Sequence, residues 1–192
     1  MFAGLIVHGM FADCITKAPE LIRGNANFVK KVVFPLELLP WTTVGAALFH
    51  AAISFLVLVV MAPVLGASLH WSGLLLPLVI APYAILTLGV CWLLASFGVY
   101  LRDVGQAMGV LSSVLLFVSP VFYRTSVLPP ALQILVSINP LTYVIEQTRG
   151  LMFAGAPLSL DRLAFYWIIS IAVGWLGFAW FQRSRDGFAD VL

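Results

Sequence analysis

The stretch from Val44 to Leu65, VGAALFHAAISFLVLVVMAPVL, contains no Asp, Glu, Lys or Arg. Uncharged apolar runs of this kind recur at 71–101, 104–123 and 163–181. In an α-helix, about 20 apolar residues match a hydrocarbon core about 30 Å thick. We therefore expect an all-α, polytopic membrane protein whose full transmembrane helices lie at 41–65, 71–100, 104–123 and 163–182.

The composition supports the same fold class. Hydrophobic residues make up 62% of the 192 residues and charged residues 9%, and the mean hydropathy is +1.06. These values exclude a soluble domain of appreciable size, so we treat 1–192 as a single transmembrane domain. Cys14 and Cys91 lie far apart in the sequence and indicate neither a disulfide framework nor a metal site. The net charge of +2 is too small to indicate a nucleic-acid partner.

The placement of the basic residues predicts the orientation. If four spans alternate sides, seven basic residues fall on one face of the membrane: Lys17, Arg23, Lys30, Lys31, Arg102, Arg183 and Arg185. Three fall on the other: Arg124, Arg149 and Arg162. The face richer in basic residues is normally cytoplasmic. This pattern predicts a cytoplasmic C-terminus.

Two apolar segments are too short for ordinary spans. Residues 1–16 lack the basic start and the cleavage site of a signal peptide, and we interpret them as the end of a truncated span. Residues 127–152 are interrupted by Asn139-Pro140. Because broken helices at membrane depth must be buried in protein or line a cavity, we expect a re-entrant pair of short helices on the outer side. The alternative is a loop that lies flat on the outer surface.

The polar segment 17–35 precedes the first full span. On a helix, Asn27, Lys30 and Lys31 share one face, at spacings i, i+3 and i+4. Asn25 could cap the start of this helix and Pro35 would end it. The pattern fits a short amphipathic helix at the cytoplasmic surface. Such a helix could dock on a partner protein or be held there by lipid alone.

Five short motifs occur in register along the chain. They are Asn-Ala-Asn-Phe-Val-Lys-Lys-Val-Val-Phe-Pro at 25–35, Val-Tyr-Leu-Arg-Asp-Val at 99–104, Ser-Pro-Val-Phe-Tyr at 119–123, Ser-Ile-Asn-Pro-Leu at 137–141 and Thr-Arg-Gly at 148–150. Together they resemble the type-2 ATP-binding-cassette exporter permeases that move O-antigen, capsule or teichoic acid. Such permeases usually begin with an interfacial helix and a further span, so the resemblance covers the C-terminal part of one.

The resemblance implies a homodimeric permease in the bacterial plasma (inner) membrane, multi-pass and surrounded by membrane lipids. It would pair with a separate ATPase subunit that binds ATP and Mg, hold no cofactor itself, and export a glycan substrate. The residues implied in coupling to the ATPase are Asn25, Asn27, Phe28, Lys30, Lys31, Phe34, Pro35, Arg102 and Asp103. Those implied in an outer gate are Asn139, Pro140, Glu146 and Arg149. Aromatic rings that could stack on sugar faces along a channel are Trp92, Phe97, Tyr100, Phe117, Phe122 and Tyr123.

The source of energy can be argued from the residues themselves. The four predicted full spans contain no carboxylate, whereas ion-coupled carriers need ionisable groups along their pathway. The chain also lacks a Gly-x-x-x-x-Gly-Lys-Ser/Thr phosphate loop. An active transporter of this composition must take its energy from another subunit, and the chain itself is not predicted to be an enzyme.

Two alternatives remain open. The chain could be a related permease for drugs or another small hydrophobic substrate. It could also be an integral membrane enzyme, because Glu146 and Arg149 lie one helical turn apart in the re-entrant segment. A mutual i, i+3 ion pair that stabilises the outer gate is the other interpretation of these two residues.

Overall fold

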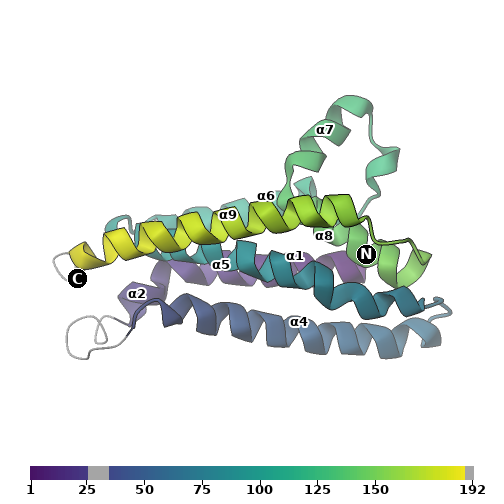
Figure 1. Ribbon diagram of the computed structural model, residues 1–192, viewed down its shortest axis with the longest axis horizontal. Coiled ribbons are helices and arrows are strands. Elements are labelled where there is room, and N and C mark those ends of the chain that lie inside the picture. Colours follow the sequence, from purple (N-terminus) through teal and green to yellow (C-terminus); the bar gives the residue numbers. More distant parts are fainter. Residues whose placement is uncertain (26–34, 189–192) are drawn as a thin grey trace.

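The computed structural model describes residues 1–25 and 35–188, which fold into a bundle of helices joined by short turns (Figure 1). Three of its helical segments are long and apolar enough to cross a membrane: Leu38–Val64, Trp71–Tyr100 and Leu160–Gly187. The main helices are α1 (Phe2–Lys17), α2 (Leu21–Gly24), α4 (Leu38–Val64), α5 (Leu76–Tyr100), α6 (Val104–Val118), α7 (Pro130–Ile138), α8 (Pro140–Arg149) and α9 (Leu160–Ser184). Short turns of other helix types are η1 (Ala18–Glu20), η2 (Trp71–Leu75), η3 (Thr125–Val127), η4 (Gly150–Ala154) and η5 (Arg185–Gly187). The all-helical fold class is confirmed.

Helix α1 lies within the core of the bundle. It contacts α4, α5, α6 and α8, and Val7, Cys14 and Ile15 on it are buried. Tyr83 of α5 is fully buried and donates its hydroxyl hydrogen to the Val7 carbonyl oxygen at 2.8 Å. The ring of Tyr83 stacks on that of Phe11 with the centroids 6.4 Å apart. The short apolar segment at the start of the chain therefore organises the core.

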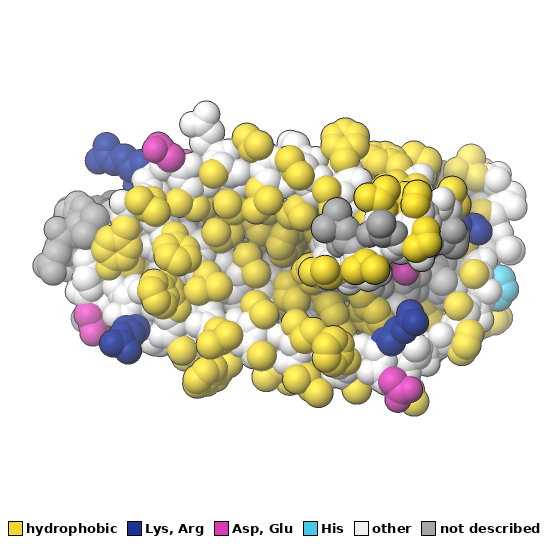
Figure 2. Space-filling view, turned by 90° about the horizontal axis from the view of Figure 1, so that it is seen from above, with side chains coloured by type: hydrophobic (Ala, Val, Ile, Leu, Met, Phe, Trp, Pro, Cys, Tyr) yellow, Lys and Arg dark blue, Asp and Glu magenta, His cyan; other side chains and the backbone are white. Residues whose placement is uncertain are grey.

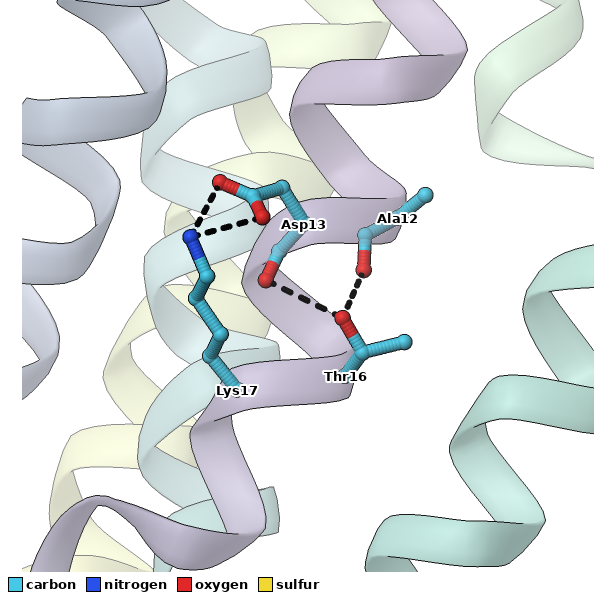
Figure 3. A network of polar contacts seen from close by, with 4 residues as sticks. All are labelled: Ala12, Asp13, Thr16 and Lys17. Atoms are coloured by element: carbon cyan, nitrogen blue, oxygen red, sulfur yellow. Dashed lines mark hydrogen bonds and ion pairs between the residues drawn. The ribbon is translucent and has the colours of Figure 1, made fainter.

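The C-terminal end of α1 carries the polar network drawn in Figure 3. The Lys17 ammonium lies 2.7 Å from Oδ1 of Asp13, one turn earlier, and both side chains are partly exposed. The Thr16 hydroxyl donates to the Ala12 carbonyl oxygen at 2.7 Å. An exposed pair at this spacing contributes only a few tenths of a kcal/mol. Its main effect is to neutralise the Asp13 carboxylate where the apolar part of α1 ends.

Contacts between distant segments define the two ends of the bundle. At the first end, the Tyr100 hydroxyl donates to the Ser184 carbonyl oxygen at 3.1 Å, and Arg185 lies 3.6 Å from Glu37. At the second end, the backbone N–H of His70 donates to the Met152 carbonyl oxygen at 3.0 Å. After the roles expected from the sequence, we name the first the coupling end and the second the outer end. Figure 1 shows α2 and the C-terminus at the former and the N-terminus at the latter.

Charged side chains lie toward these two ends of the bundle. Among the described residues, the basic side chains on segments of the coupling end are Lys17, Arg23, Arg102, Arg183 and Arg185, and those on segments of the outer end are Arg124, Arg149 and Arg162. Figure 2 shows a broad hydrophobic middle, with the Lys, Arg, Asp and Glu side chains toward the ends of the long axis. The middle therefore matches a bilayer core in character.

Helix α6 is shorter than the span predicted at 104–123. It has 15 residues, Val104–Val118, and measures about 22 Å at 1.5 Å per residue. Ser119 is extended, with φ −76° and ψ 147°, because the following residue, Pro120, disfavours the helical conformation before it. The prediction of four full transmembrane helices was therefore wrong for 104–123, and three helices of the described residues are long enough to span. The short helix still leads from the coupling end to the outer end.

Helices α5 and α9 pack with their backbones in contact. A Cβ placed on Gly177 would collide with the carbonyl oxygen of Gly89, and one placed on Gly89 would lie 2.7 Å from the Cα of Gly174. Without a strong hydrophobic driving force in lipid, small residues at such crossings let helices gain van der Waals contact. Only glycine fits at these positions.

We expect Gly177→Ala to force α5 and α9 apart. Overpacking of this kind costs about 1–3 kcal/mol, which for a chain of this size lowers the melting temperature by about 5 °C. Thermal unfolding of the purified protein in detergent measures the effect. Gly45→Ala is the matched control, since a Cβ on Gly45 would have no other atom within 4 Å. Equal melting temperatures for the two variants would contradict the packing argument.

Candidate functional site

The outer end carries the break at Asn139-Pro140 between α7 and α8. Pro140 is the first residue of α8, where its missing N–H costs nothing. The Asn139 side chain accepts a hydrogen bond from the Leu141 N–H at 3.0 Å and so caps α8. Its Nδ2 donates to the hydroxyl oxygen of Ser119 at 2.8 Å. One side chain thus starts α8 and ties it to the end of α6.

The two short helices differ in their surroundings. Helix α8 is embedded in the protein: Leu141, Val144 and Ile145 are buried, and Ile145 lies close to Gly4 of α1. Helix α7 stands away from the bundle in Figure 1, with Ile134 and Ile138 exposed. The segment between α6 and α9 therefore consists of one fixed helix and one projecting helix.

Arg149, at the end of α8, binds the turn that follows α6. Its guanidinium donates to three carbonyl oxygens, those of Pro120 at 2.9 Å, Val121 at 3.0 Å and Tyr123 at 3.1 Å. An arginine side chain stays charged in proteins. These three bonds are therefore charge-assisted and hold the turn against α8.

Glu146 and Arg149 do not pair with each other in the described part of the chain, so the prediction of a mutual ion pair was wrong. Glu146 instead accepts a hydrogen bond from the Thr125 hydroxyl. Both residues bind the same connecting segment, 119–125. Arg149 binds the carbonyl oxygens of residues 120, 121 and 123, and Glu146 binds Thr125. Ser119 and Thr125 belong to this network as well, and no pattern in the sequence had singled them out as partners.

The coupling end is described only in part. Asn27, Phe28, Lys30, Lys31 and Phe34 lie outside the described residues. Asn25 ends α2, and its side chain donates to the Leu21 carbonyl oxygen at 2.8 Å. The role expected for Asn25 as the N-cap of a following helix involves residues 26–28, which lie outside the described residues, so it stays a prediction.

The remaining residues of the coupling end surround the start of α4. Pro35 is exposed, as are Arg102 and Asp103 in the turn between α5 and α6. Glu37 lies 3.6 Å from Arg185, and its carbonyl oxygen accepts from the Trp92 indole N–H at 3.2 Å. The point at which α4 begins is thus fixed by both α5 and α9. Sequence reasoning missed Arg185 because the contact joins residues far apart in the chain.

The six aromatic residues proposed for a channel form two groups. On α5, Trp92 is only 6% exposed and packs against Trp41 and Phe178, while Phe97 and Tyr100 contact α9 and its extension. The second group lies where α6 ends. Phe117 is 70% exposed and lies 6.3 Å from Phe122, and the Tyr123 hydroxyl donates to the Val118 carbonyl oxygen at 2.7 Å. The structure does not bring the two groups together.

We expect Arg149→Gln to loosen the segment 119–125. Each hydrogen bond from a charged donor contributes about 1.5–3 kcal/mol, so loss of one to two net bonds predicts amide exchange about 10- to 100-fold faster. Hydrogen–deuterium exchange of this segment measures the effect. Arg124→Gln is the control, because Arg124 is exposed and belongs to the same segment. Identical exchange in both variants would show that Arg149 does not hold the turn.

Comparison with known proteins places these features in a family. The chain matches the family model for the ABC-2 type transporter over residues 1–153. It is 25% identical over 194 residues to an O-antigen export system permease protein RfbA of Klebsiella pneumoniae, covering 100% of this chain and 74% of the relative. It is 23% identical over 192 residues to an RfbA of the same description from Myxococcus xanthus, covering 99% and 74%. The chain belongs to the ABC-2 type transporter family, as a multi-pass membrane subunit.

Proposed function

We propose that this chain is the permease subunit of an ABC transporter that exports a polysaccharide or a lipid-linked glycan across the bacterial plasma membrane. The observation that carries the proposal is similarity along the whole chain to relatives named as O-antigen export permeases, from two organisms. The five motifs in register support it from the sequence side.

A separate ATPase subunit would drive the transport. The chain has no phosphate loop, and no cluster of potential metal ligands occurs among the residues that were described. ATP and Mg would therefore be bound by the partner. The segment 25–35 together with the Arg102-Asp103 turn would form the docking surface. Glu37 lies between the segment 25–35 and α4 and contacts both Trp92 of α5 and Arg185 after α9. A displacement of the segment 25–35 would therefore move α4, α5 and α9 together.

A homodimer is the assembly we propose. None of the side chains of α6, all of them described, is buried, although the helix is almost entirely apolar. Val110, Val114 and Phe117 are among its most exposed residues. In the dimer, a second copy would pack beside this face of α6. The part of the face that the second copy leaves uncovered would line a path between the two subunits. Phe117 and Phe122 could stack on sugar rings along that path.

The connection between α6 and α9 would act as the outer gate. Helix α8 is fixed in the core, while α7 projects and has few contacts to break when it moves. Arg149 and Asn139 would keep the end of α6 attached to α8 during opening. The engagement of both Glu146 and Arg149 in such structural bonds also argues against their use in enzyme chemistry.

Charge reversal at Lys30 and Lys31 tests the coupling surface. If this face docks on the ATPase, Lys30→Glu combined with Lys31→Glu should strongly reduce co-purification of the ATPase without preventing membrane insertion. Arg124→Glu, at the outer end, is the matched control. Equal recovery of the ATPase with all variants, together with normal glycan export, would refute the coupling role. Weakened binding to anionic vesicles alone would instead indicate a lipid-bound helix.

Cysteine labelling tests the orientation. Asp186 and Val127 are both exposed and lie at opposite ends of the bundle, and the native Cys14 and Cys91 are buried. A membrane-impermeant maleimide should label Val127→Cys in intact spheroplasts and Asp186→Cys only after the membrane has been opened. The reverse pattern would place the C-terminus outside and overturn the orientation.

A further inference from the structure

A cavity of about 740 Å³ lies under α7, between α5, α8 and α9. In Figure 2 a hollow with a hydrophobic floor is visible beside the projecting α7. The volume is in the range of small-molecule sites in proteins. The proposed outer gate shares Asn139 and Glu146 with the rim of this cavity, but the export mechanism assigns no ligand to it.

The floor and the rim of the cavity differ in chemistry. Its floor is apolar, formed by Leu86 and Val90 of α5 and by Ile169 and Val173 of α9. Its rim carries charges of both signs, from Glu146, Asp161 and Arg162. Along α9, the distance from Arg162 to Val173 is about 16 Å at 1.5 Å per residue. This is about half of a 30 Å hydrocarbon core, so the cavity extends through the depth of one leaflet.

A buried tyrosine lies along α9 between the charged rim and the apolar floor. Tyr166 lines the cavity, is only 5% exposed, and its hydroxyl has no hydrogen-bond partner among the described residues. Its ring packs against that of Tyr143, with the centroids 4.9 Å apart. A buried hydroxyl without a partner costs about 1–3 kcal/mol, so a ligand that accepts its hydrogen would be favoured. The ester carbonyl of a lipid lies at this depth, between the headgroup and the acyl chains.

We propose that this cavity binds a zwitterionic phospholipid of the outer leaflet, of the phosphatidylethanolamine type. The phosphate pairs with the Arg162 guanidinium, and the ammonium pairs with the carboxylates of Asp161 and Glu146. An acyl chain covers Leu86, Val90, Ile169 and Val173, and an ester carbonyl accepts from Tyr166. The described residues that line the cavity include two carboxylates and one guanidinium, so an anionic lipid without an ammonium would meet an excess of negative charge there, which explains the choice of headgroup.

Native mass spectrometry of the purified permease tests the proposal. The detergent-solubilised protein is mixed with equal amounts of dioleoyl-phosphatidylethanolamine and dioleoyl-phosphatidylglycerol. We expect preferential retention of the ethanolamine lipid. Tyr166→Phe removes only the hydroxyl and should weaken retention about three- to tenfold, the effect of one hydrogen bond. Arg162→Gln should weaken retention of both lipids, and Asp161→Asn should reduce the preference for ethanolamine.

A matched pair of variants tests the place of binding. Ile169→Trp fills the cavity and should abolish tight retention of the lipid. Ile168→Trp makes the same change at the adjacent, 66% exposed residue, which does not line the cavity, and should leave retention unchanged.

Equal retention by these two variants, or equal retention of both lipids by the unaltered protein, would overturn the proposal. So would a change of oligomeric state in Ile169→Trp with lipid retention unchanged, because a second copy of the chain would then cover the cavity. None of these measurements depends on glycan export or on the ATPase, so the two proposals can fail separately.

Discussion

The end of α6 shows the constraint on which the whole arrangement depends. Inside a bilayer, backbone carbonyl groups have no water to bind and must find donors in the protein. Because α6 ends at Val118, the following turn has carbonyl groups outside any helix. The Arg149 guanidinium supplies hydrogen bonds to three of them, and Asn139 binds the Ser119 hydroxyl. Helix α8 is therefore placed against α1 and α5, where its charged end can reach this turn.

The sequence predicted those parts of the fold that depend on local properties. Apolar length indicated the three long helices, and the proline rule indicated the break before Pro140. Prediction failed where the partner of a residue is distant in the chain. Helical spacing suggested that Arg149 would bind Glu146, but its partners come from 120–123.

The candidate site likewise has features that the local sequence predicts and features that depend on distant contacts. The residues of the outer gate could be selected from the sequence because Asn139-Pro140 interrupts an apolar segment and charges are rare at that depth. Their geometry could not, since Asn139, Glu146 and Arg149 each form a hydrogen bond with the distant segment 119–125. The proposed channel aromatics were chosen by residue type alone. Trp92 has an indole bonded to Glu37 and a buried ring, features that only long-range packing determines.

The glycine contact between α5 and α9 has a consequence for how motion can pass through the molecule. Where Gly177 meets the backbone of Gly89, there is no layer of side chains that could repack while the helices slide. Translation by one residue would bring Phe178 or Leu176 against a carbonyl group, so these helices shift together or not at all. Trp92 of α5 and Arg185, directly after α9, both contact Glu37, and α9 begins a few residues after η4 at the other end. Helices α5 and α9 therefore move as one rigid body, and any conformational change has to occur in the helices around them.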